Sequence, residues 1–228
     1  MSLDRIEEWI NSLTHYLGVI LGLVGMGALL VKGENSGNTG YFIGSIVFTF
    51  SIILLYSMSG TYHILDHGKA KYIFRVLDHS AIYILISGSY TPYLLGVFEG
   101  ETKWILLGLQ WGLTFLGIIF KIFFVGKFGF LSTVVYLIMG WMVMFVFPEL
   151  KASISSKSLE LLILGGVSYS VGVIFYALKT RFMHAVWHLF VLAGTIFIYF
   201  SVFYIYQLKK VDTEMQTVYT FESLLKII

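Results

Sequence analysis

The stretch FMHAVWHLF, residues 182–190, places two histidines, His184 and His188, at the start of a strongly apolar run. Residues four apart lie on one face of an α-helix, so both imidazoles are expected to point in the same direction. Ionisable side chains inside a membrane are costly and usually face the interior of a helix bundle. The stretch therefore predicts a membrane helix with two potential metal ligands near one end.

The composition around this stretch is that of a membrane protein. Of 228 residues, 57% are hydrophobic and only 12% are charged, whereas soluble domains carry about 25% charged residues. The absence of cysteine excludes disulfides, thiolate metal ligands and a cysteine nucleophile. The net charge of +2 gives no indication of a nucleic-acid partner, and membrane lipids are the expected partners.

Seven apolar runs are each long enough to cross a bilayer, which takes about 20 residues. The breaks between them are short and polar. Because the bilayer core offers no water to backbone groups, each run is expected to be helical. The sequence predicts an all-α, polytopic membrane protein whose single seven-helix domain covers residues 1–228. The spans are expected at about 12–32, 41–63, 77–97, 103–124, 129–148, 159–178 and 185–208.

Lysine and arginine residues in the short loops indicate the orientation, because they are in excess on the cytoplasmic side. The side of the N-terminus carries eight of them and the other side seven, or four without the C-terminal tail. We therefore expect a cytoplasmic N-terminus and a C-terminus outside. The eight are Arg5, Lys69, Lys71, Arg75, Lys121, Lys127, Lys179 and Arg181, and the tail contributes Lys209, Lys210 and Lys226.

The histidines share one side of this predicted bundle. With seven antiparallel spans, all six fall on the membrane face of the N-terminus, together with Asp78 at the start of the third span. An isolated pair of histidines near a helix end is more often interfacial, but a cluster from four helices that includes a carboxylate favours a metal site. The six are His15, His63, His67, His79, His184 and His188.

Zinc is the ion that suits these ligands, since imidazole binds Zn, Cu, Fe and Ni whereas Ca and Mg prefer oxygen. A catalytic zinc keeps three protein ligands and one open position for water. His63, His184 and His188 supply three ligands. Asp78 is either a fourth ligand or the group that orients the water.

Two further residues are candidates for catalysis. Ala185 stands where an HExxH motif has its glutamate, so the general base must come from elsewhere, and Asp78 is the candidate. Ser59 lies one helical turn before His63 and is placed to bond the same water or a substrate oxyanion.

Five motifs resemble the hemolysin III family, within the progestin and adiponectin receptor class of seven-helix membrane proteins. The wider group includes alkaline ceramidases. The resemblance covers residues 7–208 and implies a zinc near the cytoplasmic face, held by three histidines, with the Asp78 carboxylate near the metal-bound water. The motifs are EEWINSLTH (7–15), SGTYH (59–63), DHSAIYILISGSYTP (78–92), YLIMGW (136–141) and HAVWHLFVLAG (184–194).

From residues and resemblance together we expect an integral protein of the plasma (cell) membrane that hydrolyses an amide or ester of a lipid. Zinc polarises the carbonyl and activates water, while Asp78 accepts the proton and Ser59 helps to hold the water or the oxyanion. One alternative is a zinc that only ties helices together in a receptor-like or membrane-homeostasis protein, with four protein ligands. The other is a pore-forming cytolysin, although seven uncleaved spans leave no soluble form to reach a target cell.

Overall fold

The computed structural model describes residues 2–205, and every regular element within that range is helical. The tail 209–228 and the end of the last predicted span lie outside the described residues. So do Lys209, Lys210 and Lys226, which entered the orientation count.

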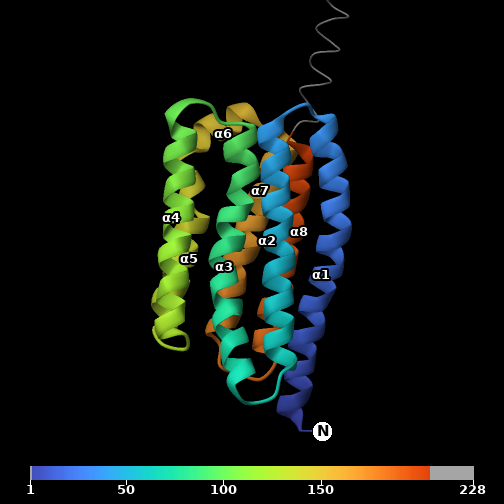
Figure 1. The fold of residues 1–228 in the computed structure, drawn as a ribbon, viewed down its shortest axis with the longest axis vertical. Coiled ribbons are helices and arrows are strands. Elements are labelled where there is room, and N and C mark those ends of the chain that lie inside the picture. Colours follow the sequence, from blue (N-terminus) through green and yellow to red (C-terminus); the bar gives the residue numbers. More distant parts are fainter. Residues whose placement is uncertain (1, 206–228) are drawn as a thin grey trace, which may run out of the picture.

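Long helices run side by side and antiparallel, joined by short loops (Figure 1). Among the described residues, six segments are long and apolar enough to cross a membrane: α1, α2, α4, Gly129–Ser153, α7 and α8. The chain is therefore an all-helical, multi-pass membrane protein. The elements are α1 (Leu3–Asn35), α2 (Thr39–Ile64), α3 (Lys69–Gly96), α4 (Gly100–Phe124), α5 (Gly129–Gly140), the 3₁₀-helix η1 (Met142–Val146), α6 (Phe147–Ser153), α7 (Ser156–Ala177) and α8 (Met183–Tyr204).

Helix α3 is 28 residues long but is not among these six segments. Charged residues occupy its first turns, and Ser, Thr and Tyr recur between its aliphatic residues. It packs between α2 and α4 (Figure 1). A central, partly polar helix is expected where a bundle encloses a polar site, because such residues face the bundle interior.

Two helices begin earlier than the apolar runs predict. Helix α1 begins at Leu3 rather than near residue 12, after Ser2 caps it by accepting a hydrogen bond from the Arg5 N–H at 3.3 Å. Helix α3 begins at Lys69 rather than near residue 77. Hydropathy marks the part of a helix that suits the hydrocarbon, whereas the hydrogen-bonded turns continue into the polar interface. The polar first turns of α1 are thereby available to the site described below.

Helix contacts depend on small residues at close crossings. A Cβ atom at Gly44 of α2 would lie 2.5 Å from the Pro92 Cα of α3, and one at Gly165 of α7 would lie 2.6 Å from the Ile198 side chain of α8. Glycine lets the helix backbones approach, and dispersion contacts then replace the hydrophobic effect that lipid does not supply.

Tyrosine hydroxyls also tie the helices to α8 inside the bundle. Thr195 of α8 bonds the hydroxyls of Tyr56 from α2 at 2.7 Å and Tyr169 from α7 at 2.8 Å. Tyr93 of α3 donates to Ser201 of α8 at 2.6 Å. Such bonds between membrane helices contribute about 0.6–2 kcal/mol each, so α8 is fixed relative to its neighbours.

The fifth predicted span, 129–148, is a broken helix rather than a continuous one. Helix α5 ends at Gly140, and the chain continues through η1 into α6. Tyr90 of α3 bonds both sides of the break: its hydroxyl accepts from the Val143 N–H at 2.9 Å and donates to the Gly140 carbonyl at 2.7 Å. Gln110 of α4 donates to the Met139 carbonyl at 2.9 Å. Non-helical backbone at membrane depth is tolerated where neighbouring helices satisfy it.

Replacing Tyr90 by phenylalanine is expected to destabilise the protein by about 1–3 kcal/mol, because two backbone groups at membrane depth, where no water replaces the lost bond, lose their partner. Thermal unfolding of the purified protein in detergent measures the effect. Tyr72→Phe is the control, since Tyr72 is 54% exposed. Equal unfolding temperatures for the two variants would contradict the assigned role.

Candidate metal centre

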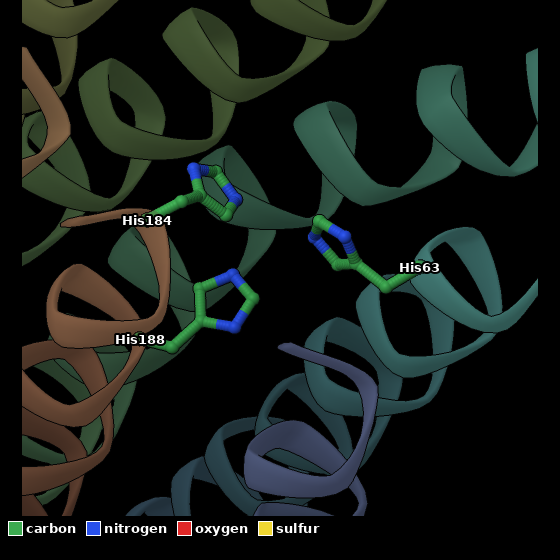
Figure 2. A group of neighbouring side chains, drawn as sticks. All are labelled: His63, His184 and His188. Atoms are coloured by element: carbon green, nitrogen blue, oxygen red, sulfur yellow. The ribbon is translucent and has the colours of Figure 1, made fainter. Parts of the chain in front are cut away.

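Three imidazoles converge between α2 and α8 near the N-terminal end of the bundle (Figure 2). His63 lies in the last turn of α2, and His184 and His188 lie in the first two turns of α8. One ring nitrogen from each lies within 4.8 Å of the other two, a spacing at which a single metal ion could be held. His63 and His188 are buried, at 4% and 0% exposure, and His184 is partly buried. The three histidines that the sequence offers as metal ligands therefore lie together, in a group that could hold a metal ion.

The outward nitrogens of two rings are held by helix α1. His63 Nδ1 lies 3.0 Å from a Glu8 carboxylate oxygen, and His188 Nδ1 lies 3.2 Å from the Asn11 carbonyl oxygen. With Nδ1–H as the donor, each Nε2 carries the lone pair. Both Nε2 atoms are buried and have no hydrogen-bond partner in the part of the chain that the structure describes. Buried polar atoms are nearly always satisfied, so two inward lone pairs without partners fit metal ligation.

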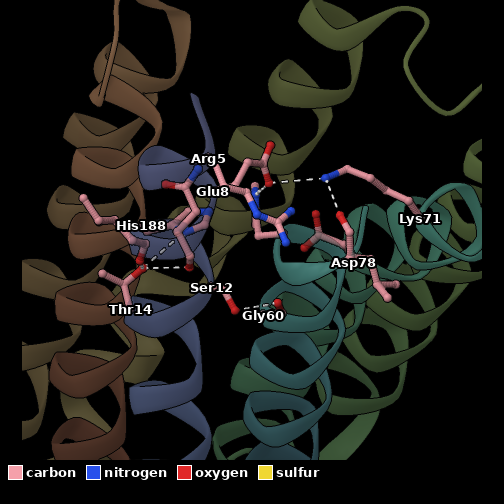
Figure 3. A network of polar contacts seen from close by, with 12 residues as sticks. Arg5, Glu8, Ser12, Thr14, Gly60, Lys71, Asp78 and His188 are labelled. Carbon is pink, nitrogen blue, oxygen red and sulfur yellow. Dashed lines mark hydrogen bonds and ion pairs between the residues drawn. The ribbon is translucent and has the colours of Figure 1, made fainter. Parts of the chain in front are cut away.

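Ion pairs and hydrogen bonds place the first turns of α1 over the site (Figure 3). Lys71 of α3 donates to Glu8 at 3.3 Å, next to the Glu8–His63 contact. Glu7 accepts a hydrogen bond from the Phe182 N–H at 2.9 Å, at the N-terminus of α8. Phe182 has a φ of 64°, so this bond secures a strained turn just before His184. Helix α1 thus positions the ligand-bearing ends of both α2 and α8.

Sequence reasoning missed Glu8. Glu8 shares a helix face with Asn11 and His15, at spacings of three and seven residues. A carboxylate at that position in EEWINSLTH was a signal that could have been used. Carboxylate–histidine–metal arrangements are common around zinc.

Replacing Glu8 by glutamine is expected to weaken metal affinity by about 10–100-fold, because the His63 tautomer and ring orientation lose their charged partner. Competition with a chelator of known affinity measures the change. Glu34→Gln, an exposed glutamate at the other end of the same helix, should leave the affinity unchanged. An unchanged affinity in Glu8→Gln would show that the contact does not support the metal.

Asp78 lies beside the three imidazoles but is not part of the group whose ligand atoms lie close enough for one ion. It is 8% exposed, and Ser59, which is 1% exposed, lies close enough to interact electrostatically with its carboxylate. His79 Nδ1 is 3.5 Å from the other side of the same carboxylate. Asp78 therefore lies next to the group of three imidazoles rather than within it.

The remaining histidines differ in their surroundings. His15 stacks on His188, with ring centroids 3.6 Å apart, and neither of its buried nitrogens has a hydrogen-bond partner. It is nevertheless outside the group that could hold a metal ion. His79 contacts Asp78 and is also outside the group that could hold a metal ion. His67 is exposed in the loop between α2 and α3.

A cavity of about 670 Å³ reaches from this site along the bundle. At the N-terminal end it is lined by Glu8, His63, Asp78 and His184. Farther along, its walls are apolar and aromatic, with residues such as Tyr93, Leu106, Met144, Leu150, Leu162 and Ile198. The size is within the range of ligand-binding cavities, about 300–1,000 Å³. A polar end and a long apolar part suit an amphiphilic ligand.

Fold and site together define the class: a multi-pass helical membrane protein with a buried group of three histidines that could hold a metal ion. The chain belongs to the haemolysin-III related family, whose family model matches residues 3–199. The resemblance seen in the five sequence motifs is thereby confirmed.

Relatives of similar length support this assignment. The chain is 44% identical over 199 residues to a Hemolysin-3 homolog of Bacillus subtilis (strain 168), covering 87% of this chain and 93% of that protein. It is 42% identical to Hemolysin-3 of Bacillus cereus, with 87% and 91% covered. A more distant relative is the Monocyte to macrophage differentiation factor of Homo sapiens, 25% identical over 213 residues, with 88% and 85% covered. No solved structure matches the chain significantly.

Proposed function

We propose that this chain is a zinc-dependent hydrolase that cleaves an amide or ester bond of a membrane lipid. The observation that carries the proposal is that the group of three imidazoles lies at the polar end of a long apolar cavity, which His63 and His184 line. Three protein ligands leave a position for water or substrate, as in catalytic zinc sites. The group contains no fourth protein ligand among the described residues, which disfavours a purely structural zinc.

The donor set favours zinc over other metals. Three imidazoles suit Zn, Cu, Fe and Ni, whereas Ca and Mg take oxygen ligands. The Glu8 and Asn11 contacts hold two imidazoles with Nε2 facing inward, as in carboxylate–histidine–zinc arrangements. When bound, zinc polarises a carbonyl and makes water more acidic.

The residues next to the metal group supply the proton transfers. The water oxygen bonds to the carbonyl carbon of the lipid while Asp78 takes up a proton from the water. The C–N or C–O bond then breaks, and the proton passes from Asp78 to the leaving nitrogen or oxygen. Ser59, which interacts electrostatically with Asp78, helps to orient this carboxylate, and the apolar cavity walls hold the acyl chain.

In this proposal the chain is one membrane domain of seven spans, with α3 as the seventh, in the plasma membrane. Helix α3 has 28 residues, a length of about 42 Å at 1.5 Å per residue, which exceeds the roughly 30 Å hydrocarbon core. The lysine and arginine distribution supports a cytoplasmic N-terminus and an outward C-terminus.

The natural absence of cysteine allows the topology to be tested directly. Single cysteines at His67 and Glu99, before and after α3, are expected to react with a membrane-impermeant maleimide from opposite sides of intact cells. Only Glu99→Cys should be labelled from outside, and His67→Cys should react only after lysis. Both residues are exposed, so burial does not limit either reaction. Labelling of both from one side would contradict the α3 span.

Turnover by the zinc-loaded, detergent-purified full chain tests the hydrolase. A panel of ceramides, phospholipids and acylglycerols with matched chains is expected to include at least one lipid that releases free fatty acid. Chelation should abolish the release and zinc should restore it. Full zinc occupancy without turnover on any lipid would overturn the hydrolase. In that case, a fall in the unfolding temperature on chelation would favour the non-enzymatic alternative, in which zinc only ties the helices together.

A further inference from the structure

We propose that Arg75 and Lys121 form a phosphate-binding subsite on the wall of the same cavity, so that the lipid taken up carries a phosphate group. This inference rests on the proposed function in that it names the class of substrate for the cavity. The inference rests on the charges around the cavity, where these two cations form no ion pair with another described residue.

The two cations approach the cavity from different helices. Arg75 lies in α3, and its guanidinium packs against Gly126 in the loop between α4 and α5. Lys121 lies in the last turn of α4 and is only 2% exposed. Both residues line the cavity. Lys121 therefore cannot be explained as a lysine that reaches from the helix end into water.

Within residues 2–205, neither cation forms an ion pair with a carboxylate. Lys121 donates to the Ser132 hydroxyl, and its ammonium lies 5.8 Å from the Tyr136 ring centroid. The buried Nε of Arg75 has no hydrogen-bond partner. Lys121 is buried and Arg75 is partly buried. A charge that is removed from water without a partner is costly, so an anion that binds here is attracted by both cations.

The carboxylates that line the cavity are committed elsewhere. Asp4 pairs with Arg181 at 3.2 Å, and Glu8 pairs with His63 and Lys71. Glu7 accepts from the Phe182 N–H. Asp78 is one turn after Arg75 and interacts with it electrostatically, but the ion-pair contact of its carboxylate is with His79 at 3.5 Å and not with the Arg75 guanidinium. Two further cations line the cavity, Lys127 and Lys179. Both are exposed, and they add to the positive electrostatic potential where the cavity meets the protein surface.

The subsite lies next to the candidate reaction centre. Tyr136, which contacts Lys121, donates to the His79 carbonyl at 2.9 Å, and His79 contacts Asp78. A guanidinium fork and an ammonium together match the several oxygens of a phosphate better than the two of a carboxylate. The apolar part of the cavity accepts the chain of the same molecule.

Binding of two ether-linked lipids to the zinc-loaded full chain tests the subsite without turnover. Ether-linked lysophosphatidic acid and the monoalkylglycerol with the same chain differ only by the phosphate, and neither has a bond for the hydrolase to cleave. Dissociation constants are measured by native mass spectrometry. The phosphate lipid is expected to bind at least about tenfold more tightly than the neutral one, from two charge-assisted interactions.

Arg75→Gln and Lys121→Met should reduce this preference to near equality, whereas Lys121→Arg should keep it. Lys69→Gln, which removes an exposed charge on the same membrane face, is the matched control and should also keep it. Displacement of the lysolipid by millimolar inorganic phosphate would support the subsite with free phosphate as its ligand. Absence of displacement alongside the preference would support the lipid headgroup as the source.

Equal binding of both lipids by the unmodified chain, or the same preference in Arg75→Gln and Lys121→Met as in Lys69→Gln, would overturn the subsite. The preference is the ratio of two dissociation constants measured on the same preparation, so a smaller fraction of folded protein does not change it. Because the lipids cannot be hydrolysed, phosphate preference without turnover in the earlier panel would refute the hydrolase and leave the subsite standing.

Discussion

The His184→Ala variant is expected to lose nearly all bound zinc, while the unmodified chain purifies with about one zinc ion, the content of a single three-histidine site. Two remaining imidazoles cannot hold the ion in the same way, and the two inward Nε2 atoms of His63 and His188 would again lack a partner. His184 is the best of the three to replace, because it is only partly buried and its loss disturbs packing least. Elemental analysis of the purified protein measures the zinc content.

His67→Ala is the matched control, because His67 is exposed in the nearby loop and should keep the full zinc content. Zinc retained in His184→Ala would show that the ion is held elsewhere. No metal in the unmodified chain after zinc supplementation would remove the basis for the hydrolase and leave a buried histidine cluster without a ligand.

The Asp78→Asn variant is expected to keep its zinc but to lose turnover by about 10²–10⁴-fold, the usual contribution of a general acid or base. Asparagine keeps the size of the side chain and its contact with Ser59, but it cannot accept the proton. The position of Asp78 outside the group of three imidazoles is the reason to expect the metal to stay. Zinc content and fatty-acid release are measured on the same preparation.

Asp66→Asn serves as the control, since the Asp66 side chain is 82% exposed and pairs only with Arg5. Loss of zinc in Asp78→Asn would identify Asp78 as a fourth ligand. The site would then be closed, and the structural alternative would be preferred over catalysis. Retained zinc with unchanged turnover would instead remove Asp78 from the proposed mechanism.

Much of the fold was predictable because a bilayer imposes a simple rule. Backbone groups without water must be satisfied within helices, so apolar runs of sufficient length give the helical segments directly. The rule could not show the break after Gly140, because the residues there are as apolar as those of an unbroken helix. The bonds that make the break tolerable come from Tyr90 and Gln110, on two other helices.

The candidate site was predictable to the extent that it depends on helix ends. Alternating span direction placed His63, His184 and His188 on one side, and the four-residue spacing placed two of them on one face. Glu8 was missed because it precedes the apolar run, and hydropathy says nothing about how far α1 extends. The phosphate subsite that we propose was equally hidden, since Arg75 and Lys121 entered the sequence argument only as loop charges.

The sequence by itself determined that the chain is a helical membrane protein of the haemolysin-III type with three histidines near one membrane face. The helical membrane fold and the shared side of the histidines follow from composition and from the period of the helix, and the family follows from the resemblance of the five motifs. All of these are local properties of the sequence. Only the tertiary structure decided that Glu8 and Asn11 orient the imidazoles, that Asp78 stands outside the group of ligands, and that an apolar cavity joins the site to Arg75 and Lys121. Those properties depend on the rotation and offset of each helix against its neighbours. Packing at close crossings such as Gly44 with Pro92 sets that rotation and offset, and no single segment encodes it.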